Sequence, residues 1–215
     1  MLLHGLARTS GSMAEMADAL RAAGYVVINV DYPSREHPIQ VLAERAVNRG
    51  LQGCKAAEAR RIHFVTHSLG GILVRHYLAD HALPELGRVV MLSPPNQGSE
   101  VADALRDEAL YQWFNGPAGQ QLGTGPDGIP ARLPEVTYPT GVITGDSPAF
   151  YDAWVADVFP GPHDGKVSVA RARVEGMSDF LVVPYSHTFI MNAGDVITQT
   201  LHFLREGRFR HGNAD

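Results

Sequence analysis

Short apolar segments alternate with helical patterns along almost the whole chain, and this alternation limits the possible folds more than any other feature. Six segments are short, mostly apolar and bounded by turn residues, which is typical of buried strands. They cover residues 1–3, 25–30, 62–66, 88–92, 140–144 and 180–183. Because these segments are apolar on both faces, they fit parallel strands that are covered by helices.

Four helical patterns lie between or after these strands, at residues 12–23, 41–53, 69–80 and 193–205. Strands that alternate with helices predict an α/β fold, with a mostly parallel sheet of about six strands and helices on both faces. The chain has 215 residues, of which 45% are hydrophobic. This is enough for one well-packed core, so we expect a single domain over residues 1–215.

Two regions interrupt the alternation and are expected to be insertions, at about residues 100–134 and 147–163. Residues 100–114 have the pattern of an amphipathic helix, whereas residues 115–134 are rich in Gly and Pro, which predicts a loop. Long excursions in a compact domain are often functional. Leu105, Trp113 and Phe114 are therefore candidates for substrate binding, with burial in the helix's own core as the alternative. The little chain that remains for a cap predicts a small cap or none.

The strongest chemical signal is the sequence Thr-His-Ser-Leu-Gly-Gly at residues 66–71, which follows a strand and opens a helix. A serine on a sharp turn between strand and helix is the setting of a nucleophile elbow. Gly70 provides the small neighbour that such a turn needs, whereas Thr66 stands where glycine is usual. A serine here would also suit a helix N-cap. We expect Ser68 to be a nucleophile, and the side chain of the adjacent His67 to point away from it.

A His-Gly turn follows the first predicted strand, at His4 and Gly5. Acyl transfer needs two N–H donors aimed at the oxyanion of the tetrahedral intermediate. The turn makes the Leu6 amide one candidate, and the Leu69 amide, directly after Ser68, is the other. Arg8 either orders this loop, meets substrate or has no role.

A serine nucleophile needs a base and an orienting carboxylate downstream. His187 lies between the last predicted strand and the last predicted helix, which is the expected place for the base. Asp164 lies in an Asp-Gly turn and is the favoured acid. Asp146, directly after a strand, is the alternative. The order Ser68, Asp164, His187 is the order that hydrolases of this strand–turn–helix type use.

Together these residues resemble the small bacterial lipases and esterases of the α/β-hydrolase superfamily, and the resemblance runs from His4-Gly5 to the helix after His187. The turn of residues 93–99, Ser-Pro-Pro-Asn-Gln-Gly-Ser, adds to it. The resemblance implies the α/β-hydrolase fold and a serine carboxylic-ester hydrolase that works through an acyl-enzyme, without metal or cofactor, on small-molecule or lipid esters of short or medium chain length. An acyltransferase, a thioesterase, an amidase or a non-catalytic binding protein on the same scaffold remain alternatives.

Composition narrows the remaining classes. The formal net charge is -5 and the basic residues are scattered, which argues against nucleic-acid binding. A single cysteine, Cys54, cannot form an intrachain disulfide or a thiolate metal site. We expect no integral membrane segment and no signal peptide at the start, hence a cytoplasmic protein, or a secreted one if a signal peptide has been removed. The sequence does not indicate an oligomeric state.

Overall fold

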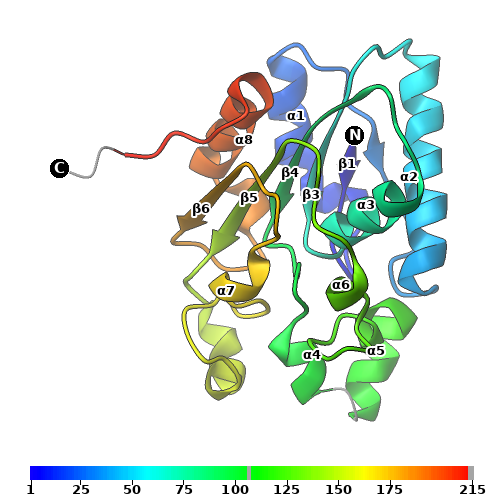
Figure 1. Cartoon of the computed structure of the whole chain (residues 1–215). Coiled ribbons are helices and arrows are strands. Elements are labelled where there is room, and N and C mark those ends of the chain that lie inside the picture. Colours follow the sequence, from blue (N-terminus) through cyan, green and yellow to red (C-terminus); the bar gives the residue numbers. More distant parts are fainter. Residues whose placement is uncertain (106–107, 213–215) are drawn as a thin grey trace.

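A six-stranded sheet forms the centre of the protein (Figure 1). In the computed structural model the described residues are 1–105 and 108–212, without the side chains of residues 109–114, 154 and 156. Every neighbouring pair of strands is parallel, in the order β2-β1-β3-β4-β5-β6. The strands are β1 (Leu2–Leu3), β2 (Asn29–Val30), β3 (Ile62–His67), β4 (Leu86–Leu92), β5 (Thr140–Gly145) and β6 (Asp179–Val183). The predicted parallel sheet of about six strands is confirmed.

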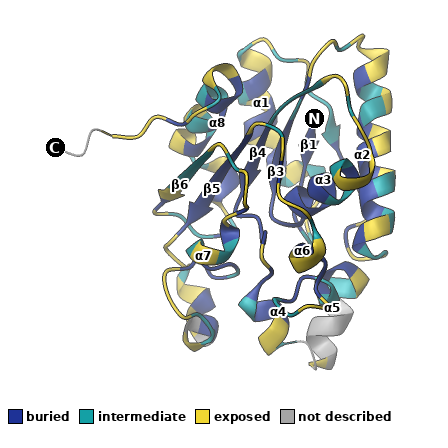
Figure 2. Cartoon of the chain, viewed as in Figure 1, coloured by how far each residue is buried: buried dark blue, intermediate teal, exposed yellow. Residues whose placement is uncertain are grey.

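Four longer helices cover the two faces of this sheet, as predicted. They are α1 (Ala14–Ala22), α2 (Ile39–Ala56), α3 (Leu69–Asp80) and α8 (Gly194–Glu206). Residues of α2 and α3 belong to one buried cluster and residues of α1 and α8 to another, so the core has one layer on each face of the sheet. Figure 2 shows the result: the central strands are mostly buried, the edge strand β6 is only partly buried, and the helices are exposed on their outer sides.

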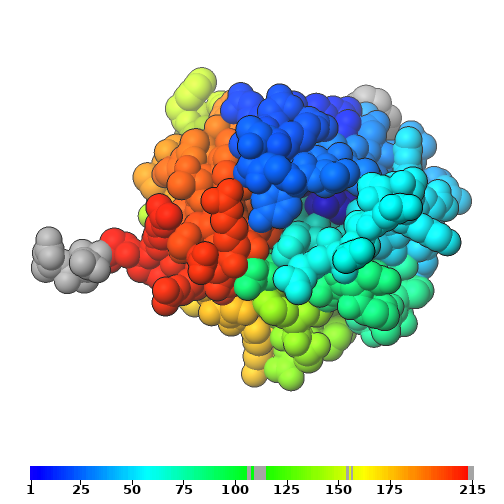
Figure 3. Space-filling model, turned by 90° about the horizontal axis from the view of Figure 1, so that it is seen from above, coloured from blue at the N-terminus to red at the C-terminus, as the bar shows by residue number. Residues whose placement is uncertain are grey.

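The second strand is shorter than predicted. Residues 25–30 read as one strand, but only Asn29 and Val30 are paired, in register with Leu2 and Leu3 of β1. The strand β1 has only two residues to pair with. The Leu2 N–H still donates to the Ile28 carbonyl at 2.8 Å, but residues 25–27 precede the paired positions. They instead line a cavity of about 240 Å³ at the amino ends of the strands. From this end, Figure 3 shows the surface hollowed between the segments that precede β2 and β3.

The first insertion differs from its prediction. Residues 100–114 form not one helix but α4 (Glu100–Ala104) and the start of α5 (Ala109–Gln120). The expected loop at 115–134 contains the rest of α5 and the single turn α6 (Ile129–Arg132). Gly116 explains part of this, because its φ of 62° breaks the helical path and Pro117 then begins a new turn. Periodicity in the sequence cannot resolve two short helices that meet at such a break.

The second insertion, 147–163, contains a 3₁₀ segment, Phe150–Val158, and is followed by the short helix α7 (Val169–Ala172). Two further 3₁₀ segments, Ser10–Met13 and Ile190–Asn192, precede α1 and α8. The insertions and α7 lie at the carboxyl ends of the strands (Figure 1). Within the described part of the chain, no helix is both long and apolar enough to cross a bilayer.

Candidate active site

Ser68 occupies the turn between β3 and α3, with φ of 51° and ψ of −120°. This backbone conformation is strained for a residue with a side chain. Two contacts hold it: the Ser68 N–H donates to the carbonyl of Leu92 on β4 at 2.9 Å, and the Ser68 carbonyl accepts from Gly71 at 3.0 Å. The fold therefore sustains a sharp strand–turn–helix connection at this serine.

Small residues allow α3 to begin so close to the sheet. A Cβ added at Gly70 would lie 2.6 Å from the carbonyl oxygen of Leu3 on β1. Thr66, which stands where glycine is usual, is fully buried, and its hydroxyl donates to the carbonyl of Val90 at 3.4 Å. The turn thus accommodates threonine at this position by turning its side chain into the sheet.

The His-Gly turn lies directly beside the nucleophile candidate. A Cβ added at Gly5 would lie 3.2 Å from Ser68 Cβ. The Leu69 amide is the first of α3 and so has no acceptor within the helix. The Leu6 amide likewise has no hydrogen-bond partner among the residues that the structure describes. Two free N–H groups therefore flank the region of Ser68.

The His4 side chain holds this turn through a ring contact and two hydrogen bonds. Its buried ring stacks on Tyr32, with ring centroids 4.0 Å apart. Nδ1 lies 2.8 Å from the Gly5 carbonyl, and Nε2 accepts from the Tyr32 N–H at 3.3 Å. Burial lowers the pKa of His4, so its contacts are those of a neutral ring that donates through Nδ1. His4 thus holds the loop through these contacts.

His187 and Asp164 lie together. His187 Nδ1 is 2.8 Å from Asp164 Oδ2, and the His187 N–H donates to the Asp164 carbonyl at 2.9 Å. Because an ionised carboxylate only accepts, the shared proton belongs to Nδ1, which leaves Nε2 as an acceptor. Asp146, the alternative acid, is exposed and accepts instead from the Ser147 hydroxyl at 2.9 Å.

The local fold keeps Asp164 ionised although its side chain is fully buried. Burial raises the pKa of this carboxyl. Attraction to His187 when its ring is protonated, the hydrogen bond from His187, and hydrogen bonds from Ser93 and the Lys166 amide outweigh burial and leave the pKa below its usual range. Oδ1 accepts from the amides of Lys166 and Val167 at 3.0 and 2.9 Å. Asp164 is therefore an anion with both oxygens engaged.

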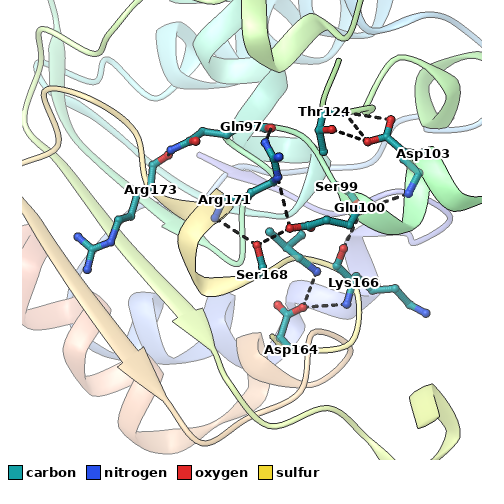
Figure 4. A network of polar contacts seen from close by, with 12 residues as sticks. Gln97, Ser99, Glu100, Asp103, Thr124, Asp164, Lys166, Ser168, Arg171 and Arg173 are labelled. Atoms are coloured by element: carbon teal, nitrogen blue, oxygen red, sulfur yellow. Dashed lines mark hydrogen bonds and ion pairs between the residues drawn. The ribbon is translucent and has the colours of Figure 1, made fainter. Parts of the chain in front are cut away.

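A polar network ties the loop of Asp164 to the first insertion (Figure 4). The Ser99 hydroxyl donates to the Lys166 carbonyl at 2.7 Å. Glu100, the first residue of α4, accepts from the Ser168 hydroxyl at 2.6 Å and lies 3.3 Å from Arg171 Nε. The loop that contains Asp164 and the start of the first insertion are thus joined by hydrogen bonds and an ion pair.

His67 makes a contact that the sequence did not indicate, while the expectation that its side chain points away from Ser68 stays a prediction. Its ring lies against that of His187, with centroids 4.9 Å apart, and its Nε2 donates to the His187 carbonyl at 2.9 Å. The ring is almost completely buried, and burial together with the nearby charge of His187 holds the pKa of His67 well below its usual range. The link joins the turn of Ser68 to the candidate base His187.

The candidates for substrate binding receive no such support. Leu105 directly follows α4 and is half-buried, while the side chains of Trp113 and Phe114 lie outside the described residues. A different residue of the first insertion approaches the site. A Cβ added at Gly119 of α5 would lie 3.1 Å from the Leu6 side chain. Among the described residues, no group of three or more His, Cys, Asp or Glu is arranged to hold a metal ion.

The alpha/beta hydrolase family model matches residues 1–206. The chain belongs to this family. The predicted fold class is thereby confirmed, because the parallel sheet and its elbow are those of an α/β hydrolase. No curated protein sequence matches the chain.

Solved structures show the same fold. A lipase of Bacillus licheniformis, BlEst2 in its mature form, is 20% identical with a TM-score of 0.73, over 94% of this chain and 90% of that one. Phospholipase PlaB from Legionella pneumophila is 21% identical with a TM-score of 0.76, over 96% of this chain and 59% of that one. Est816, described as an N-acyl homoserine lactone degrading enzyme, is 16% identical with a TM-score of 0.59, over 94% and 90%.

Proposed function

We propose that this α/β hydrolase is a serine hydrolase that cleaves carboxylic esters through an acyl-enzyme. The observation that carries the proposal is the bond between His187 Nδ1 and buried, ionised Asp164 at 2.8 Å, linked through His67 to the strained turn of Ser68. A histidine that is oriented by a carboxylate is the kind of base that activates a serine hydroxyl.

In the proposed reaction His187 Nε2 takes the proton of the Ser68 hydroxyl as its oxygen attacks the ester carbonyl. The Leu6 and Leu69 amides stabilise the oxyanion. His187 then gives the proton to the leaving alcohol, and the C–O bond of the ester breaks. Water repeats the sequence on the acyl-enzyme: His187 removes a proton from water and returns it to Ser68 as the acid leaves. Asp164 keeps the ring oriented and stabilises its charged form throughout.

The ester class is supported by the structural neighbours, which include a lipase, a phospholipase and a lactone-degrading enzyme. We expect short- and medium-chain p-nitrophenyl esters to be hydrolysed by the wild type and not by Ser68→Ala. A panel of graded acyl lengths, with one amide and one thioester, measures this. Turnover near the wild-type rate in Ser68→Ala would refute the proposal, and a clear preference for the thioester or amide would change the class.

The two candidate acids offer a matched comparison in the same assay. Asp164→Asn removes the anion that orients His187, and kcat should fall by about 10⁴-fold. Asp146→Asn changes an exposed carboxyl bonded to Ser147, and kcat should stay within about twofold of wild type. A large loss in Asp146→Asn with little loss in Asp164→Asn would assign the acid to Asp146 instead.

A further inference from the structure

A polar hollow of about 590 Å³ lies next to the His-Gly turn. Its walls are residues 7–9, residues 31–36 and Arg49 of α2, and we call it the arginine hollow. The first two segments follow the carboxyl ends of β1 and β2, so the hollow opens on the same edge of the sheet as Ser68. Its volume is within the range of small-molecule sites.

A short stretch of chain, residues 5–8, runs from beside Ser68 to the hollow. Gly5 lies against Ser68, Leu6 carries the candidate oxyanion amide, and Ala7 and Arg8 already line the hollow. The chain turns tightly here, because the Arg8 N–H donates to the Gly5 carbonyl at 3.3 Å. A substrate whose carbonyl oxygen meets the Leu6 amide therefore has the hollow within reach of one of its ends.

Hydrogen bonds hold the walls in place before any ligand arrives. The Ala7 N–H donates to the Ser34 hydroxyl at 3.0 Å, and Ala7 itself has a positive φ of 55°. Arg49 donates to the Asp31 carbonyl at 3.0 Å, and Asp31 Oδ1 accepts from the Ser10 N–H at 2.8 Å. A site with fixed walls loses little entropy on binding.

Charge defines the chemistry of the hollow. Its lining residues include three arginines, Arg8, Arg35 and Arg49, and two acidic residues, Asp31 and Glu36. Asp31 is partly engaged by Ser10. The exposed Arg8 side chain has no hydrogen bond or ion pair within the described part of the chain. The charge of Arg8 still acts on the neighbouring site. Burial and His187 are the larger causes of the low pKa of His67, and the charge of Arg8 lowers this pKa further.

We infer that the arginine hollow binds an anionic oxygen group of the ester substrate, a carboxylate or a phosphate, with Arg8 as the residue that selects for it. An arginine pairs with either group through parallel N–H donors. An unsubstituted acyl chain would instead remove water from these charges and offer them no hydrogen-bond partner. This inference rests on the proposed ester hydrolysis and narrows its substrate class.

The test compares esters that differ only in the anion. On the acyl side, p-nitrophenyl valerate is paired with the mono-p-nitrophenyl ester of glutaric acid. On the alcohol side, phenyl butyrate is paired with p-butyryloxyphenyl phosphate. In the wild type we expect kcat/KM for the anionic ester to exceed that for its neutral partner by about tenfold or more in at least one pair. In Arg8→Gln this ratio should fall about tenfold, and Arg8→Lys should fall less.

Arg60→Gln is the matched control, because Arg60 is an exposed arginine on the loop before β3, at the opposite end of the strands. Its ratio should equal that of the wild type. Arg49→Gln is the second variant if Arg8→Gln does not fold. No preference for the anion in either pair, or a ratio that Arg8→Gln and Arg49→Gln leave unchanged, overturns the inference.

Failure of the proposed function gives a different result. If the wild type hydrolyses no ester, calorimetric titration with phenyl phosphate still tests the hollow. Binding by the wild type that Arg8→Gln loses and Arg60→Gln keeps supports an anion site, while absence of binding by the wild type overturns it.

Discussion

At the scale of single residues, the candidate site holds a strained backbone at Ser68 and a buried charge at Asp164. Ser68 has a strained backbone, and a strained φ/ψ of this kind costs about 1–3 kcal/mol. Asp164 is a fully buried anion whose charge is supported by His187 and two amides. Such states persist only where the surrounding structure enforces them, and they occur preferentially at functional sites.

His67 gives a pH-dependent prediction at this scale. Its pKa in the folded protein is far below the usual value, chiefly because of burial. As the pH falls through about 6.5, the unfolded chain binds a proton at His67 that the folded protein does not, so stability falls with decreasing pH. We expect the free energy of unfolding in urea to decline between about pH 7 and 5 less steeply in His67→Gln than in the wild type.

Glutamine can still donate a hydrogen bond to the His187 carbonyl, so the variant should keep that contact at pH 8. Parallel pH dependences for wild type and His67→Gln would show that His67 does not resist protonation in the folded state.

At the scale of elements, the junction of β3 and α3 decides the geometry. Gly70 lets α3 start against the end of β1, where an added Cβ would meet a backbone carbonyl that cannot move aside cheaply. The turn, and with it the position of Ser68, depends on this close approach.

Gly70→Ala should therefore lower the free energy of unfolding by about 1–3 kcal/mol, as overpacking does elsewhere, measured by urea denaturation. Gly161→Ala is the control, because an added Cβ there has no neighbour within 4 Å. A stability of Gly70→Ala equal to that of wild type would mean that the junction has room that the structure does not show.

The main elements could be predicted from sequence because their signals are local. All six strands and the four long helices follow from apolar runs and periodicity, and α3 begins and ends where predicted. The break inside α5 could not, because it depends on the conformation of Gly116. The contact of His67 with His187 was missed because it joins residues 120 positions apart. The only sign of this contact in the sequence was a histidine directly before Ser68, and the direction of its side chain depends on the fold.

At the scale of the whole molecule, the parallel sheet explains how residues far apart in sequence come together. All six strands end on the same edge, so the loops after β1, β3 and β6 and the segment after β5 meet there. Ser68, Asp164 and His187 come from three of these connections. The single-domain organisation over residues 1–215 stays a prediction.

The central claim is that Ser68 is an activated nucleophile. A fluorophosphonate probe forms a covalent bond with such a serine, and peptide mass spectrometry locates the label. We expect one label per chain, on the peptide that contains Ser68, and none on the Ser68→Ala variant, whose folding is checked by its urea transition. A folded wild-type protein that remains unlabelled, or a label on another residue that persists in Ser68→Ala, would contradict the account.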